Sequence, residues 1–215
     1  MTGVGVRFLS GGGDRVIPLR GRQIVLRDWQ MADLEVWAYW MAPTHEWQAL
    51  DGPYYPAPDA EKVAAMMAEK RAQIEAGEWP RPRRDLVIAD IRTDDLMGHM
   101  NWYWQSEETH WLSLGLGVYN LSHWRRGVGY EALGLWSDYM WRAQLAIVRL
   151  DLRTWSGNRG MMRLAEKLGY KEEACFRRAR IVNGVYYDAL GYGVLREEWQ
   201  ERYPDGFAAH LALPV

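Results

Sequence analysis

The chain has 215 residues, with 26 lysines and arginines against 28 aspartates and glutamates, and a formal net charge of -2. That length suits a single domain with its own core, and a charge so close to balance lacks the basic excess that general nucleic-acid binding requires. The single cysteine, Cys175, excludes an intrachain disulfide and a multi-cysteine zinc cluster, and it is typical of a reducing compartment.

Neither a targeting segment nor a membrane segment is evident in the sequence. Residues 1–10 have no basic start and no long apolar run, and no later stretch stays apolar over the roughly 20 residues of a membrane span. The five histidines and the carboxylates show no ligand spacing such as His-Glu-x-x-His. We therefore expect a soluble cytoplasmic protein that makes no membrane contact and holds no metal.

Turn residues and apolar spacing divide the first part of the chain. In order, we expect a hairpin in 1–22, a strand at 23–27, a helix from 31 that stops before 43, a ring-rich loop at 43–58, a helix over 59–77 and a proline-broken connection at 78–85. Asp59 is a helix N-cap residue, and Gly77 suits a helix end.

The second part of the chain begins with a predicted antiparallel meander. In order, we expect strands at 86–92, 97–105 and 110–119, a helix after 129, a strand at 147–155, a helix at 159–168, a hairpin around 183–184 and a short helix at 196–202. This order predicts an α+β fold with one mixed sheet and helices on both faces. We interpret 1–22 as an N-terminal extension, 23–203 as the single domain and 204–215 as a C-terminal tail.

The segment Arg126-Gly127-Val128-Gly129-Tyr130-Glu131 stands where the strand near Tyr119 gives way to a helix. The first turn of a helix leaves backbone N–H groups without partners and carries a partial positive charge, which together hold a phosphate. Glycines allow a phosphate close approach, and Arg126 adds a charge. A pair of glycines here can also be a plain tight turn, so the segment alone leaves both interpretations open.

Two rival nucleotide motifs are absent, namely Gly-x-x-x-x-Gly-Lys-Ser/Thr and Gly-x-Gly-x-x-Gly with a later acidic residue. Instead, residues 126–129 resemble the Q/R-x-x-G-x-G/A acetyl-CoA signature of the GNAT superfamily, and Glu131-Ala132-Leu133 resembles the continuation seen in its RimJ/RimL-type branch. Further segments resemble that branch: Asn158 with the helix end Arg163 to Tyr170, the hairpin Asn183 to Asp188, and Leu195 to Trp199. The resemblance is strong over 86–200 and weaker over 23–85.

The resemblance implies the GNAT fold, a mixed and mostly antiparallel sheet of six to seven strands. Its fourth and fifth strands would splay apart, and the pantetheine arm of acetyl-CoA would lie in the gap, bonded to backbone near 116–120. The cofactor-binding residues implied in this way are Leu116, Val118, Tyr119, Arg126, Gly127, Val128, Gly129, Tyr130, Glu131 and Asn158. A homodimer is compatible with the resemblance, because dimers are common among relatives.

Two departures from the family pattern affect the site. Glu131 replaces a small residue, and its carboxylate would repel phosphate if it pointed inward; an outward orientation, which suits the helix dipole, is favoured. Relatives often protonate the leaving thiolate with a serine or tyrosine, where this chain has Met161 and Ala165. Tyr119 is a substitute donor, although a packed ring at a strand end is an equally good interpretation. Water can also protonate a thiolate.

Acetyl transfer needs a neutral amine, and an ordinary lysine-like amine is protonated at neutral pH, so a base should lie near the acceptor. The candidates are Glu108, before the fourth strand, and His99 in the third. Each also has an ordinary explanation, as a solvated charge and as a structural histidine. A backbone N–H near Val118 would face the charge that develops on the carbonyl oxygen.

The chain has 13 tryptophans, and many of its rings fall near segments that border the acceptor in this family. These rings are Trp40, Trp47, Tyr54, Tyr55, Trp102, Tyr103 and Trp104. Packing explains them by default, but rings in a cleft would favour an apolar, aromatic or cationic acceptor. The leading hypothesis is therefore an N-acetyltransferase that moves the acetyl group of acetyl-CoA to a primary amine, of a protein N-terminus or a small molecule. The alternative is a noncatalytic module that binds or senses acyl-CoA.

Overall fold

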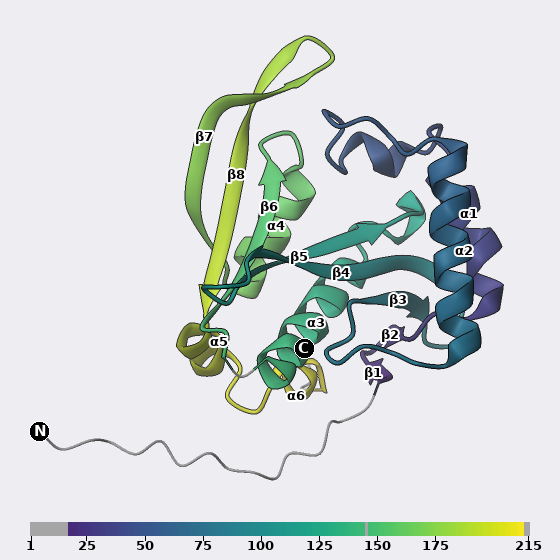
Figure 1. The fold of residues 1–215 in the computed structure, drawn as a ribbon. Helices are drawn as coiled ribbons and strands as arrows, with labels where there is room; N and C mark the ends of the chain where they lie inside the picture. The colour runs from purple at the N-terminus through teal and green to yellow at the C-terminus, as the bar shows by residue number, and fades with distance from the viewer. Residues whose placement is uncertain (1–16, 145, 213–215) are drawn as a thin grey trace, which may run out of the picture.

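One eight-stranded sheet organises the computed structural model, which describes residues 17–144 and 146–212 (Figure 1). The strand order is β1-β2-β3-β4-β5-β6-β8-β7, and every neighbouring pair is antiparallel except β5 with β6. The strands are β1 (Leu19–Arg20), β2 (Ile24–Arg27), β3 (Asp85–Asp90), β4 (Leu96–Ser106), β5 (Trp111–Val118), β6 (Arg149–Trp155), β7 (Lys171–Val182) and β8 (Val185–Leu195). The α+β prediction is confirmed.

The sheet has one strand more than the predicted six to seven. The additional strand is β1, which comes from the segment assigned to the N-terminal extension and pairs with β2. This strand falls within the hairpin predicted in 1–22, although it pairs with β2. The rest of the predicted hairpin, residues 1–16, lies outside the described residues.

Helices cover both faces of the sheet, as predicted. They are α1 (Met31–Met41), α2 (Ala60–Ala76), α3 (Val128–Ala143), α4 (Arg159–Leu168), α5 (Arg196–Arg202) and α6 (Phe207–Ala212), with short 3-10 helices at Glu46–Ala49 and Leu121–His123. Because side chains alternate along a strand, Leu86 and Ile88 enter the core beneath α3, while Val87 and Ala89 enter a second core beneath α1. None of the described helices is long and apolar enough to cross a membrane.

Helix α3 is the central packing element. Nearly all of its residues are buried, and Trp136 is fully so. A Cβ on Gly134 would come within 2.2 Å of the Phe207 ring, so only glycine lets α6 pack this closely. Phe207 is fully buried, and the segment predicted as a C-terminal tail therefore contributes a helix to the core.

The sheet opens between β5 and β6. These two strands pair in parallel only from Leu112 to Leu114, opposite Leu150 to Leu152, and no pairing continues beyond them. The amide of Tyr119 donates to Met97 of β4, and backbone groups alternate in direction along a strand, so the amides of Leu116 and Val118 face the gap. The predicted splay of the fourth and fifth GNAT-like strands is present as this gap.

Strands β7 and β8 form a long hairpin that projects beyond the rest of the sheet (Figure 1). Its turn residues Asn183 and Gly184 have φ of 50° and 76°, which is the conformation predicted from the Asn-Gly pair. Its outer strand β7 is largely exposed, and Arg180 lies over the ring of Tyr54, 4.5 Å from its centroid. The hairpin therefore reaches the loop between α1 and α2.

Candidate functional site

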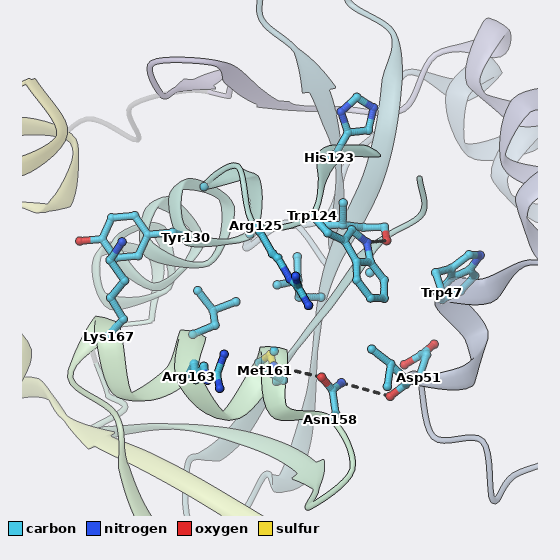
Figure 2. Close-up of a pocket in the computed structure, with 18 residues that line it drawn as sticks. Trp47, Asp51, His123, Trp124, Arg125, Tyr130, Asn158, Met161, Arg163 and Lys167 are labelled. Atoms are coloured by element: carbon cyan, nitrogen blue, oxygen red, sulfur yellow. Dashed lines mark hydrogen bonds between the residues drawn. The ribbon is translucent and has the colours of Figure 1, made fainter. Parts of the chain in front are cut away.

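A cavity of about 370 Å³ occupies the gap between β5 and β6 and extends to the start of α3. Its lining comes from the α1–α2 loop, the end of β5, the α3 start and the exposed side of α4 (Figure 2). The lining residues are Trp47, Leu50, Asp51, Leu116, Gly117, Val118, His123, Trp124, Arg125, Gly127, Gly129, Tyr130, Asn158, Gly160, Met161, Arg163, Leu164 and Lys167. Six of the predicted cofactor-binding residues are among them: Leu116, Val118, Gly127, Gly129, Tyr130 and Asn158.

The backbone at the start of α3 is shaped for an anion. Arg125 and Gly127 both have positive φ, 59° and 91°, and a non-glycine residue in this region is uncommon. The first intrahelical bond runs from the amide of Glu131 to the carbonyl of Gly127, so the amides of Val128, Gly129 and Tyr130 precede the helical ladder. These amides and the helix dipole make a positive surface at this end of the cavity.

Three formal cations line the cavity from its middle to the α4 side. They are Arg125 in the turn before α3, and Arg163 and Lys167, one turn apart on α4. Lys167 also lies over the Tyr130 ring, 4.4 Å from its centroid. The predicted cation, Arg126, is exposed and does not line the cavity, although its carbonyl accepts a bond from Gln23. Arg125 takes the place expected for Arg126, because the positive φ at Arg125 turns the chain one residue earlier.

Glu131 lies outside the cavity. Its carboxylate accepts hydrogen bonds from the amides of Arg22 (2.8 Å) and Gln23 (3.1 Å), and from the Gln23 side chain (3.1 Å). A Cβ on Gly21 would lie 2.2 Å from this carboxylate, so glycine makes room for the contact. The outward orientation is the one that the structure has, and the buried carboxylate ties α3 to the segment between β1 and β2.

The edge of β5 offers backbone groups to the middle of the cavity. The amides of Leu116 and Val118 face the gap, while the Val118 carbonyl accepts a bond from the indole of Trp124 at 2.9 Å. On the other face of the strand, Gly117 leaves room for the ring of His99, whose Cε1 would lie 3.3 Å from an added Cβ. An extended chain in the gap would therefore find backbone partners along β5.

Asn158 joins the two walls of the cavity. Its Oδ1 accepts from the amide of Met161 and caps α4, while its Nδ2 donates to the carbonyl of Leu50 at 3.1 Å (Figure 2). The indole of Trp155 donates to the same carbonyl, also at 3.1 Å. Both polar groups of the Asn158 side chain are therefore used within the protein, and this residue positions the α1–α2 loop against β6 and α4.

Tyr119 and His99 form a buried pair beside the cavity. The Tyr119 hydroxyl lies 2.7 Å from Nδ1 of His99, and its ring packs between Trp40 and Trp47. Burial raises the pKa of Tyr119 well above its usual value. Burial also lowers the pKa of His99, an effect that Asp51 partly offsets. Tyr119 is fully buried and does not line the cavity, so its packing role is the one the geometry supports.

Glu108 lies at the wrong end of β5 for a role at the cavity. It stands in the turn before Trp111, and the cavity lies at the Val118 end, roughly 25 Å away along the strand. Hydrogen bonds from its own backbone amide and from Ser106 lower the pKa of this exposed carboxyl. The sequence suggested proximity because Glu108 adjoins the strand, but the strand runs away from it.

The aromatic residues predicted near the acceptor divide into two groups. Trp47 lines the cavity, while Tyr54 and Tyr55 lie next to it under Arg180. The others pack in the cores or stand at the surface: Trp40, Trp102, Trp104 and Tyr103. Trp124, which the sequence analysis did not single out, supplies a second indole to the lining.

Asp51 is the functional candidate that the sequence analysis missed. It is the one carboxylate among the described lining residues, and it lies beside Trp47, opposite the end with Lys167 and Tyr130 (Figure 2). Desolvation raises the pKa of its carboxyl, which His99 partly counteracts. A single loop aspartate carries no sequence signal, because its position depends on contacts made 100 residues later.

The cavity fits an elongated molecule that is anionic at one end. Backbone amides and three cations suit phosphates, the free edge of β5 suits an amide-bearing arm, and the Asp51 end lacks positive lining groups among the described residues. No group of three or more histidines, cysteines or carboxylates gathers in the described residues as a metal site would require.

Comparisons with known proteins agree with this geometry. Residues 23–171 match the model of the acetyltransferase (GNAT) domain family. Two uncharacterized N-acetyltransferases of Bacillus subtilis are similar in sequence. YokL is 35% identical over 57 residues, covering 26% of this chain and 32% of YokL, and YoaA is 26% identical over 133 residues, covering 62% and 68%. The first of these matches therefore spans about a third of its relative.

Solved structures share the fold. A GNAT-family acetyltransferase from Bacillus anthracis has a TM-score of 0.66 at 16% identity, covering 84% of this chain and 99% of that one. Mycobacterium smegmatis RimJ, solved with CoA-disulfide, has a TM-score of 0.64 at 20% identity and covers 87% of both chains. The matched domain spans well over half of the sequence and contains every cavity-lining residue, so this chain belongs to the GNAT acetyltransferase family.

Proposed function

We propose that this protein is an acetyl-CoA-dependent N-acetyltransferase that transfers the acetyl group directly to a primary amine. The observation that carries the proposal is one continuous cavity with phosphate-binding chemistry at one end, an unpaired strand edge in the middle and a carboxylate near two indoles at the other end. Acetyl-CoA is the cosubstrate of this family, and its thioester supplies the acetyl group.

The amides of Val128, Gly129 and Tyr130, with Arg125, Arg163 and Lys167, would hold the pyrophosphate and the neighbouring phosphate. The glycines at 127 and 129 keep this surface open; a Cβ on Gly129 would stand 3.3 Å from Leu164 and 3.5 Å from Leu116, both in the lining. The amides of Leu116 and Val118 would bind the pantetheine arm, and the Val118 amide would face the charge on the reacting carbonyl oxygen.

Among the described lining residues, only Tyr130 carries a hydroxyl, and it lies at the phosphate end, where burial raises its pKa to about 12. Met161 and the buried Tyr119 offer no donor to the cavity. Water is therefore the proton source for the leaving thiolate, whose pKa near 8.5 makes it a good leaving group. This lack of a donor favours the second candidate function, a noncatalytic module that binds or senses acyl-CoA.

The finer placement in the RimJ/RimL-type branch is part of the proposal and rests on Glu131-Ala132-Leu133 and the helix end before Tyr170. The RimJ structure of M. smegmatis supports it through the fold alone. The cytoplasmic location and the homodimer stay predictions.

Calorimetric titration with acetyl-CoA, followed by a thiol-release assay on a panel of amines, tests the proposal. We expect saturable binding of acetyl-CoA and CoA release that depends on the amine. Binding without turnover on any amine would support the noncatalytic module instead. An absence of acetyl-CoA binding would overturn both functions.

A further inference from the structure

The two ends of the cavity have opposite charge. Arg163 and Lys167 line the end beside Tyr130, Arg125 lies in the middle of the cavity next to Trp124, and Asp51, the only described carboxylate in the lining, stands at the other end near Trp47 (Figure 2). A ligand that fits the whole cavity therefore presents anionic groups to α3 and α4. The acceptor molecule that meets this ligand at the Asp51 end carries a positive charge.

The two indoles near Asp51 have their polar atoms committed elsewhere. The Nε1 of Trp47 donates to the carbonyl of Trp40 at 3.0 Å, and the Nε1 of Trp124 donates to the carbonyl of Val118. These hydrogen bonds fix the positions of both indoles. The indole surface that faces the cavity is therefore apolar, because each Nε1 already has a partner. Ring faces together with a carboxylate recognise an organic ammonium group.

The loop that carries Asp51 is held down on its outer side. The carbonyl of Leu50 receives two hydrogen bonds, from Trp155 and Asn158, and the guanidinium of Arg180 covers the rings of Tyr54 and Tyr55, 4.5 and 5.8 Å from their centroids. The β7–β8 hairpin thus packs against the outer side of the loop that carries Asp51. This contact narrows the path that the residues behind a polypeptide N-terminus would take past the loop.

From these contacts we infer that the acceptor is a small organic primary amine, and that Asp51 binds its ammonium group between Trp47 and Trp124 and takes its proton. This inference rests on the proposed acetyltransferase function and names its acceptor class and its base. In the transfer, one proton of the ammonium group passes to the Asp51 carboxylate, and the freed amine forms the C–N bond while the C–S bond of the thioester breaks. A second proton leaves the nitrogen and reaches the thiolate through water.

The position of Asp51 agrees with the role of a base. Desolvation raises the pKa of its carboxyl above that of an ordinary aspartate, which makes it a better proton acceptor. Burial lowers the pKa of His99 and so favours its neutral form, while the Asp51 carboxylate acts in the opposite direction.

The test uses Asp51→Asn, which keeps the side-chain size and removes the charge. Glu46→Gln is the matched control, because Glu46 is an exposed carboxylate in the same loop and does not line the cavity. The probes are 2-phenylethylamine, spermidine and an alanine tetrapeptide as acceptors, and phenethyltrimethylammonium as a cation that cannot be acetylated. Acetyl-CoA affinity is measured in parallel by calorimetry.

We expect Asp51→Asn to lower kcat/KM for the small amine that the wild type prefers by about 100-fold, the scale of general-base catalysis. The variant should also bind phenethyltrimethylammonium more weakly, while acetyl-CoA affinity and Glu46→Gln stay at wild-type values. Wild-type kinetics in Asp51→Asn, with acetyl-CoA still bound and turned over, would overturn the inference and leave the acetyltransferase function standing. A higher kcat/KM for the tetrapeptide than for both small amines would overturn the acceptor class. Loss of acetyl-CoA binding in the wild type would instead overturn the function itself.

Discussion

The two ends of the cavity are built in different ways. The end at α3 consists of backbone amides, two glycines and cations that lie within 45 residues of one another in the sequence. The amides belong to the start of the buried helix α3, and two of the cations stand on α4. The Asp51 end consists of a loop that is held by residues more than 100 positions away, through the carbonyl of Leu50. The difference teaches that the phosphate end follows from local sequence, whereas the acceptor end exists only once the sheet, α4 and the hairpin are assembled.

The largest expected effect concerns the phosphate end. The double variant Arg163→Gln, Lys167→Gln should weaken acetyl-CoA binding by about 100-fold or more, since each charge-assisted contact contributes roughly 1.5–3 kcal/mol. The weakening should be smaller at high salt. Calorimetry measures it, and Arg159→Gln, an exposed cation on the same helix outside the lining, is the control. An unchanged affinity in the double variant would place the phosphates elsewhere.

A variant at Glu131 distinguishes two roles for this residue: stabilising the phosphate end of the cavity and contacting the phosphate itself. Glu131→Ala leaves two partly buried backbone amides without their acceptor, and should lower the free energy of unfolding by about 2 kcal/mol, or about 30-fold in the folding equilibrium. For a chain of this size Tm should fall by about 4–8 °C. Thermal denaturation checks this, with the exposed Glu166→Ala as control. An increase in acetyl-CoA affinity would contradict the outward orientation of the carboxylate.

The pH dependence of the acceptor end should follow Asp51. The carboxylate acts only when ionised, so kcat/KM for the amine should fall about tenfold per pH unit below the Asp51 pKa. Because desolvation raises that pKa, the fall should begin at a higher pH than an ordinary aspartate would give. The groups that act on Asp51 or receive its field are His99 on β4, Tyr54 in its own loop and Tyr119 after β5. The pH profile of Asp51→Asn should lack this fall in kcat/KM at low pH. If the fall persists in the variant, another group causes it.

The smallest expected effect tests the tether of the loop. Trp155→Phe keeps a ring over Gly157 but removes one of the two donors to the Leu50 carbonyl. The amine KM should rise about fivefold, the scale of one hydrogen bond, with acetyl-CoA affinity unchanged. Steady-state kinetics and calorimetry on the same sample measure both. An equal weakening of the amine KM and of the acetyl-CoA affinity would mean that Trp155 supports the whole cavity. The two ends of the cavity would then not be structurally independent.

Much of the fold could be predicted from the sequence because its signals are local. Helix α4 has an Asn158 cap and a Gly169 end with φ of 96°, and the hairpin turn has its Asn-Gly pair, so these boundaries could be placed closely. Helix α6 was missed for the opposite reason. Its place is set by the fit of Phe207 against Gly134, a contact between distant residues that no local pattern encodes.

The same distinction holds for the site. Gly127, Gly129 and Asn158 could be identified because they belong to ordered motifs, and all three line the cavity. Arg163 and Lys167 had a signal that was not used, since cations four apart on a capped helix share one face. Asp51 had none, and Glu108 was chosen from its nearness in sequence to a strand whose far end holds the site.

The carbonyl of Leu50 has a mechanical consequence. Strands β5 and β6 part after Leu114, and the sheet there has no ladder to hold its halves together. The hydrogen bonds that Trp155 and Asn158 donate to the Leu50 carbonyl connect the β6 side of the gap to the α1–α2 loop. Any widening of the gap must lengthen these two hydrogen bonds. A ligand that binds along β5 will therefore change the stability of the loop that carries Asp51. Hydrogen exchange at residues 46–51 would report the filling of the gap from a distance.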